Sequence, residues 1–336
     1  MVWLEFLLWV VVILIAGTKA TRYADVIAET TGLGRIWIGL LLLGIVTSLP
    51  ELITGLSSVS LVSEAGIPDL GLGTLLGSCT FNLTILAVMD VLHRGGPVLN
   101  LASTRQMTSA GIGILLFVVA ALGIFLGSGP TLGWVGGVSI ALLTAYLLGA
   151  WWVFRSERNL NPPSVAAPPS LAEVGPVVSG LWFKFALTAV MIIVAGVRLS
   201  FVGNEIAEVT SWDTSFVGSL FLAFSTSMPE LVVGISALRI GAIDMAVADV
   251  LGANMLDVTY IFLLDLFYAG GPIFSSVSDA HMVTALVAAS MSLIVIVALR
   301  FRQERKTFFV ISWYGVLLAG LYIFNAYALF ISGVTQ

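Results

Sequence analysis

The sequence predicts an all-α integral membrane protein in which ten transmembrane helices form two inverted five-helix repeats. Three observations support this fold class. Of the 336 residues, 59% are hydrophobic and only 10% are charged, and this composition does not fit a water-soluble surface. Apolar runs of about 20 residues, the length that spans a bilayer, recur along the chain. The second half of the sequence also repeats the first.

The apolar runs are separated by short connections, and we expect one transmembrane helix from each. They cover residues 2–23, 36–62, 70–92, 107–126, 132–154, 177–202, 215–238, 245–268, 282–299 and 308–331. Residues 155–173 are rich in proline, serine and charge, as is typical of a linker. We therefore expect a first repeat at 1–155, a cytoplasmic linker at 156–174 and a second repeat at 175–336, with no soluble domain.

The flanks of the runs predict how the chain lies in the membrane. The first run carries Glu5 rather than a basic flank and has no small-residue cleavage site, so we interpret it as a retained helix and not a signal peptide. Of the 14 Lys and Arg residues, all except Arg198 fall in connections on one side. By the positive-inside rule, this distribution predicts a multi-pass cell-membrane protein with both termini outside.

The internal repeat is an ungapped alignment of residues 15–52 with residues 194–231, which resumes further along the chain. It pairs Gly17 with Gly196, Lys19 with Arg198, Glu51 with Glu230, Asp69 with Asp244, Asn82 with Asp257 and Asp90 with Asp265. Because five helices are an odd number, the second repeat must cross the membrane in the opposite orientation. Inverted repeats are typical of secondary transporters, whose substrate site lies near the midplane where the repeats meet. Inversion also explains why Arg198 falls on the other side.

Each repeat places a similar polar peptide inside an expected helix: TSLPE at 47–51 and TSMPE at 226–230. Proline has no N–H, so the carbonyl four residues earlier, that of Val46 or Ser225, loses its helical donor and becomes available to a cation. The Thr and Ser hydroxyls share the helical face of the Glu. The next helices add GSCTFN at 77–82 and GANMLD at 252–257. The candidate ligands are Glu51, Glu230, Thr47, Thr226, Ser48, Ser227, Ser78, Asn82 and Asp257.

This all-oxygen set suits a hard cation such as Ca²⁺. A single buried Glu has a structural explanation, but its duplication at matching positions favours a functional one. We therefore predict a secondary transporter that exchanges a divalent cation. A cation channel is less favoured because the polar groups concentrate at the midplane. The sequence contains neither HExxH nor GxSxG, and no His is paired with the acids. These motifs therefore give no indication of an enzyme.

The other polar residues receive weaker interpretations. Asp69 and Asp244 open their helices and are expected to cap them, whereas Asp90 and Asp265 are expected at the membrane interface. Asp249 is either a fourth buried acid or packs toward a polar neighbour. We assign no role to His93 or His281, and interpret Cys79 as a small residue at a helix contact.

On these motifs the sequence resembles the calcium/cation antiporter superfamily, in particular the compact prokaryotic sodium/calcium exchangers. The resemblance covers nearly the whole chain and is carried by an alpha-1 motif at 44–82 and an alpha-2 motif at 223–257. It implies Ca²⁺ between Glu51 and Glu230, with oxygens of Thr47 and Thr226. It further implies sodium sites aided by Ser48, Ser78 and Ser227. Asn82 and a protonated or metal-bound Asp257 would complete the centre. The first and sixth helices would slide across the rest of the bundle to alternate access.

The resemblance also implies the ions and partners. Ca²⁺ and Na⁺, or H⁺, are the transported ions, no cofactor is expected, and the partners are the lipid bilayer and inorganic cations, not nucleic acid. A monomer is the working expectation. The sequence departs from the family pattern at Ala253, where a serine hydroxyl would help to hold one sodium ion. Na⁺ and H⁺ therefore both stay open as counter-ions.

Overall fold

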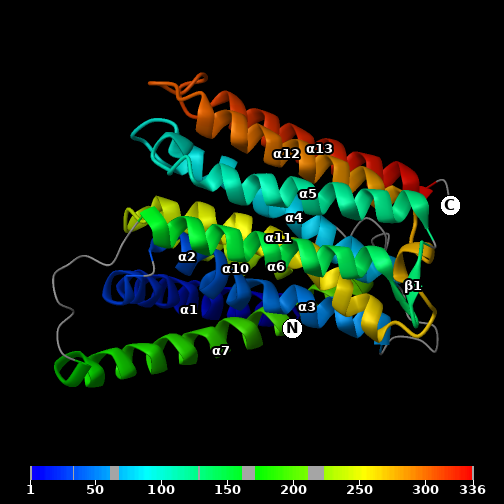
Figure 1. Ribbon diagram of the computed structural model, residues 1–336, viewed down its shortest axis with the longest axis horizontal. Helices are drawn as coiled ribbons and strands as arrows, with labels where there is room; N and C mark the ends of the chain where they lie inside the picture. The colour runs from blue at the N-terminus through cyan, green and yellow to red at the C-terminus, as the bar shows by residue number, and fades with distance from the viewer. Residues whose placement is uncertain are drawn as a thin grey trace.

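The computed structural model describes residues 2–32, 34–60, 68–127, 129–160, 171–210 and 223–334. Its elements in chain order are α1 (Val2–Thr31), α2 (Arg35–Trp37), the π-helical turn η1 (Ile38–Leu43), α3 (Gly44–Ser60), α4 (Pro68–Leu92), η2 (Val98–Asn100), α5 (Gln106–Leu126), β1 (Thr131–Leu132), β2 (Val135–Gly136), α6 (Gly137–Leu160), α7 (Leu171–Thr210), α9 (Ala223–Thr226), α10 (Met228–Arg239), α11 (Ile243–Phe267), η4 (Ile273–Ser275), α12 (Ala280–Arg300) and α13 (Trp313–Val334). The long helices run roughly along one direction (Figure 1).

Nine helices in the described ranges are long and apolar enough to cross a membrane. The tenth predicted helix, at 215–238, begins among residues outside those ranges and continues as α9 and α10. The predicted membrane bundle is therefore confirmed. The predicted linker at 156–174 carries helical backbone at both ends, because α6 continues to Leu160 and α7 begins at Leu171, while its middle lies outside the described residues.

Helices α1 and α7 lie side by side along one edge of the bundle (Figure 1). An ion pair between Glu5 and Arg198 joins them. Their small residues face the polar-motif helices: a Cβ on Gly17 would meet Val232 at 2.8 Å, and one on Gly196 would meet the ring of Pro50. The paired helices thus pack closely against both motifs, and their small residues allow that approach.

Helices α4 and α11 form the centre of the bundle, and α11 packs against both α3 and α4. The turn η1 approaches α11 so closely that a Cβ on Gly252 would overlap the backbone of Leu40. A Cβ on Gly39 would likewise lie 2.5 Å from the carbonyl oxygen of Met245. Backbone therefore meets backbone at these two glycines, which only a residue without a side chain permits.

Asp69 and Asp244 bind the starts of helices of the opposite repeat. The Asp69 carboxylate accepts a hydrogen bond from the Ser278 backbone N–H at 2.6 Å, at the start of α12. Asp244 accepts one from the Ser103 N–H at 2.6 Å, at the start of α5. His281, for which the sequence indicated no role, also contacts Asp69, at 3.0 Å. A carboxylate is favourable at the N-terminus of its own helix or of a neighbouring one. Here each carboxylate binds the start of a helix of the other repeat and so joins the two repeats.

Asp90 and Asp265 are fully buried in the protein near the C-terminal ends of α4 and α11, and their position at the membrane interface stays a prediction. Asp90 accepts hydrogen bonds from the N–H groups of Val98 at 2.9 Å and Ser312 at 2.7 Å. Asp265 accepts the equivalent bonds, from Ile273 at 2.7 Å and Gly136 at 2.8 Å. Each carboxylate therefore joins a helix end to the loop that follows it and to the start of the last helix of the other repeat. The two repeats make the same contacts twice.

We expect Asp265→Asn to lower the free energy of unfolding by about 1–3 kcal/mol. The amide has one acceptor oxygen where the carboxylate has two, so one buried N–H loses its partner. Thermal unfolding of the purified protein in detergent checks this. Asp279→Asn is the matched control, because Asp279 is exposed and its side chain makes no capping bond. Equal midpoints for the two variants would contradict the role given to Asp265.

Candidate cation site

The two polar peptides meet inside the bundle. All nine predicted ligands are 0% exposed, namely Thr47, Ser48, Glu51, Ser78, Asn82, Thr226, Ser227, Glu230 and Asp257. They come from α3, α4, α9, α10 and α11 and from the residue between α9 and α10. The structure therefore brings both motifs to one buried region, which neither lipid nor bulk water reaches in this conformation.

The serine hydroxyl of each motif donates a hydrogen bond to the glutamate carboxylate of the other motif. Ser227 donates a hydrogen bond to Glu51 Oε1 at 3.1 Å, and Ser48 donates one to Glu230 Oε1 at 3.4 Å. The second carboxylate oxygen, Oε2, of each Glu is buried without a hydrogen-bond partner. Buried carboxylate oxygens are usually satisfied, so both oxygens are open to a ligand.

The two motifs differ in backbone. Helix α3 continues past Pro50 without a break, directly after the π-helical turn η1. In the second motif the helix is interrupted at Ser227, whose φ is −86° and ψ 10°, between α9 and α10. Such irregular backbone is typical of binding sites in membrane transporters. That the carbonyls of Val46 and Ser225 bind a cation stays a prediction.

The pseudo-two-fold axis runs between α4 and α11. Asn82 donates from Nδ2 to Asp257 Oδ2 at 3.5 Å, and these residues are each other's repeat partners, 175 positions apart. Cys79 and Asn254 have the same separation and interact reciprocally: Asn254 Nδ2 donates to the Cys79 carbonyl at 3.1 Å, and the Cys79 thiol donates to the Asn254 carbonyl at 3.7 Å. Pairs of matching residues in contact define such an axis.

Asn254 was missed by the sequence analysis, although it lies within GANMLD. Its Oδ1 is buried without a partner, as is Oδ1 of Asn82. Both amide oxygens are thus additional potential ligands. One signal in the sequence could have identified it. Asn254 is the repeat partner of Cys79, which was interpreted as a helix-contact residue, and an amide at such a position makes a polar contact between helices.

Asp249 is a fourth fully buried acid, and it also has a polar neighbour. Thr47 Oγ1 donates to Asp249 Oδ1 at 3.5 Å, and to the carbonyl of Leu43 at 3.1 Å. On the opposite side, the Ser78 and Thr226 hydroxyls lie 3.2 Å apart. The site is therefore symmetric in its glutamates but not in the partners of its threonines.

Four acids share this region, and no Lys or Arg is among the buried side chains of the described residues. Uncompensated charge in a membrane interior is unfavourable, so cations or protons must balance it. No three His, Cys, Asp or Glu side chains converge as a ready-made metal cluster in the described ranges. A bound ion would therefore use hydroxyl and amide oxygens as well as carboxylates, a donor set that suits hard cations.

The chain is similar to several membrane proteins. Inner membrane protein YrbG of Escherichia coli is 28% identical over 258 residues, 74% of each chain. The membrane protein MJ0091 of Methanocaldococcus jannaschii is 25% identical over 300 residues, 88% of this chain and 87% of its own. Sodium/calcium exchanger MaX1 of Methanosarcina acetivorans is 33% identical over 119 residues, 35% of this chain and 31% of its own.

Among solved structures, the sodium-calcium exchanger NCX_Mj soaked with 10 mM Na⁺ has the same fold. It matches with a TM-score of 0.73 over 96% of this chain and 98% of its own, at 20% identity. The sequence profile described as sodium/calcium exchanger protein matches residues 1–155 and 180–331. Because this match covers both halves, the chain belongs to the sodium/calcium exchanger protein family, as a cation-exchanging membrane transporter and not an enzyme.

Proposed function

We propose that this protein is a secondary antiporter that exchanges Ca²⁺ for Na⁺ by alternating access. The observation that supports this most is that each glutamate accepts a hydrogen bond from the serine of the other motif and keeps one buried oxygen that has no partner. Two carboxylates neutralise one divalent cation. The Thr47 and Thr226 hydroxyls, from the same motifs, would complete its oxygen shell.

The same geometry supports competition between ions. Ser48, Ser227 and Ser78 lie beside the two glutamates or Thr226, where they could hold Na⁺ once Ca²⁺ has left. Asn82 and Asp257 form the contact on the axis and would complete this set. A site with several bare carboxylates is costly in low dielectric. The empty protein would therefore switch poorly, which couples the movement of one ion to that of the other.

Alternating access would use the outer pair of helices, α1 and α7. They approach both motifs closely at Gly17 and Gly196, and Ile13 and Leu199 also pack with Met228 of the second motif, so a sliding movement would change these contacts. Each repeat contributes one of these helices, one polar motif and one central helix. This division supports repeat boundaries near 155 and 175. Because one chain supplies both motifs, a monomer would be enough to form the site.

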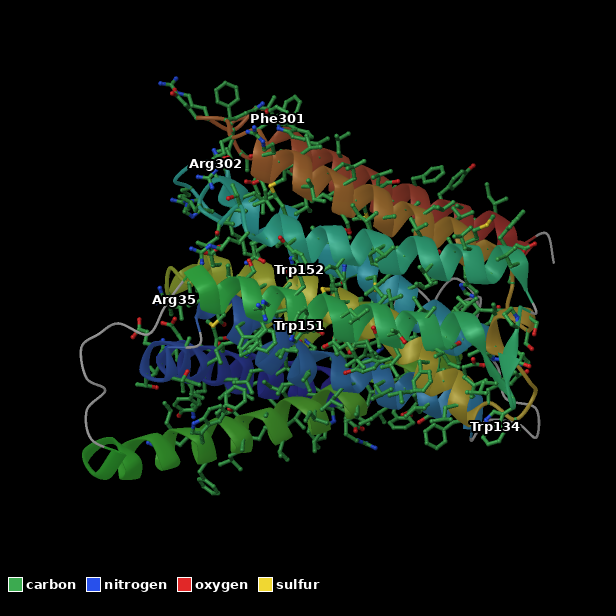
Figure 2. The ribbon with its side chains drawn as sticks, in the orientation of Figure 1. Arg35, Trp134, Trp151, Trp152, Phe301 and Arg302 are labelled. Carbon is green, nitrogen blue, oxygen red and sulfur yellow. The ribbon has the colours of Figure 1, made fainter. Side chains whose placement is uncertain are left out.

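The proposed orientation has both termini outside. Arg35, Phe301 and Arg302 lie at one end of the bundle, and Trp134 lies at the other (Figure 2). Lys306 reaches the His93 carbonyl at 2.6 Å, and Arg302 the Ala102 carbonyl at 2.9 Å. The basic connections thus gather at a single end, which the positive-inside rule assigns to the cytoplasm.

Radioactive Ca²⁺ uptake into proteoliposomes tests the proposal. An outward Na⁺ gradient at clamped pH is compared with a pH gradient in the absence of Na⁺, and Glu51→Gln serves as the blank. We expect uptake driven by Na⁺ and absent from the blank. Uptake driven by the pH gradient alone would instead support H⁺ coupling, and uptake that needs neither gradient would support a channel.

A further inference from the structure

The two ends of the candidate site differ where the pseudo-symmetry predicts that they should match. Thr226 lies 3.2 Å from the hydroxyl of Ser78. The repeat partners of these residues are Thr47 and Ala253. Ala253 is fully buried and has no hydroxyl, so Thr47 has no equivalent partner at this position.

Asp249 takes that place from one turn earlier on α11. It precedes Ala253 by four residues, so both lie on one helical face, and it accepts a hydrogen bond from Thr47 at 3.5 Å. Its repeat partner, Thr74, instead donates to the Leu70 carbonyl of its own helix at 2.8 Å. A carboxylate at the Thr47 end thus stands opposite a neutral hydroxyl at the Thr226 end.

Asp249 has a carboxylate oxygen that the protein does not satisfy. The side chain is fully buried and its Oδ2 has no hydrogen-bond partner. The Leu43 and Gly44 carbonyl oxygens lie 3.1 and 3.4 Å from the Thr47 hydroxyl. No Lys or Arg is buried in the described residues to balance the charge.

We propose that Asp249 and Thr47 form a binding site for a monovalent alkali cation such as Na⁺, in addition to the divalent site between Glu51 and Glu230. This inference builds on the proposed function. A monovalent ion fits because a single carboxylate supplies a single charge, whereas the two glutamates already match a divalent ion. The Asp249 carboxylate would thereby supply an ion contact at the Thr47 end, where Ala253 has no hydroxyl.

Equilibrium binding of ²²Na⁺ and ⁴⁵Ca²⁺ to the purified full-length protein tests this at fixed pH. Asp249→Asn keeps the side-chain volume and removes the charge. We expect it to weaken one Na⁺ site about tenfold or more, since contacts to charged groups contribute about 1.5–3 kcal/mol. Its Ca²⁺ affinity without Na⁺ should stay within about threefold. Thr74→Val, at the repeat partner, should change neither.

Rescue and alternative outcomes make the test specific. Adding Ala253→Ser to Asp249→Asn should recover part of the Na⁺ affinity, because it returns a hydroxyl to the Thr47 end. Asp249→Ser is a second uncharged variant in case the Asn protein does not fold. Unchanged Na⁺ binding, or equal losses of Na⁺ and Ca²⁺ binding, would overturn the inference. Wild-type protein that binds no Na⁺ would instead contradict the proposed Na⁺ coupling itself.

Discussion

Glu230→Gln is expected to lower Ca²⁺ uptake and Ca²⁺ affinity by about 100-fold or more, with the fold retained. The variant leaves a single glutamate to balance a divalent ion in a region that is 0% exposed. Removing one member of a buried charge pair costs about 3–5 kcal/mol, and each 1.4 kcal/mol is a factor of ten. Initial rates of ⁴⁵Ca²⁺ uptake and equilibrium binding measure both quantities.

The double variant Glu51→Gln/Glu230→Gln sharpens this prediction. If both carboxylates hold the same ion, the second substitution adds little to the first, because the site has already failed. Glu304→Gln is the control, since Glu304 is exposed in the loop after α12. Additive losses would indicate that the two glutamates act on separate ions. Uptake by Glu230→Gln above about a tenth of the wild-type rate would contradict the paired site.

Gly252→Ala is expected to destabilise the protein by about 1–3 kcal/mol or more. The added methyl would overlap backbone atoms of Leu40, which cannot rotate aside as a side chain can. Overpacking of this kind forces two elements apart, here α11 and η1, which leads directly into α3 with its ligands. We expect a lower thermal unfolding midpoint in detergent and weaker Na⁺ binding, since Thr47 and Asp249 would separate.

Gly320→Ala provides the matched control for this prediction. A Cβ at Gly320 has nothing within 4 Å, and the residue lies inside α13. The same chemical change should therefore be neutral or stabilising by up to about 1 kcal/mol, through helix propensity alone. If both alanine variants unfold at the same temperature, close backbone contact at Gly252 would not be what holds η1 on α11.

The fold and most of the site could be predicted because their signals are local or repeated. Hydropathy identifies each helix from its own residues, and the duplicated Pro-Glu peptides identify Glu51 and Glu230 without knowledge of the packing. Inversion of a five-helix repeat then requires the two peptides to meet near the midplane. The structure brings those residues together as expected.

The contacts that could not be predicted are long-range and involve backbone donors. Asp69 binds the N–H of a residue 209 positions away, and Asp90 binds one 222 positions away. Any residue except proline offers an N–H, so no side-chain pattern identifies these partners. For the same reason, the sequence did not show that Asp90 and Asp265 would be buried against backbone N–H groups. Asp249 could be identified only as a candidate, since its partner comes from the other repeat.

The reciprocal pairing of the two motifs also sets an order of events during synthesis. Ser227 follows its partner Glu51 by 176 residues, which a ribosome adding roughly 5–20 residues per second translates in about 9 to 35 s. For that interval the nascent first half holds an acidic helix whose counterpart does not yet exist, and an unpaired acid in lipid is unfavourable. The Glu51 carboxyl can therefore gain its hydrogen bond from the other motif only after the second half has been inserted.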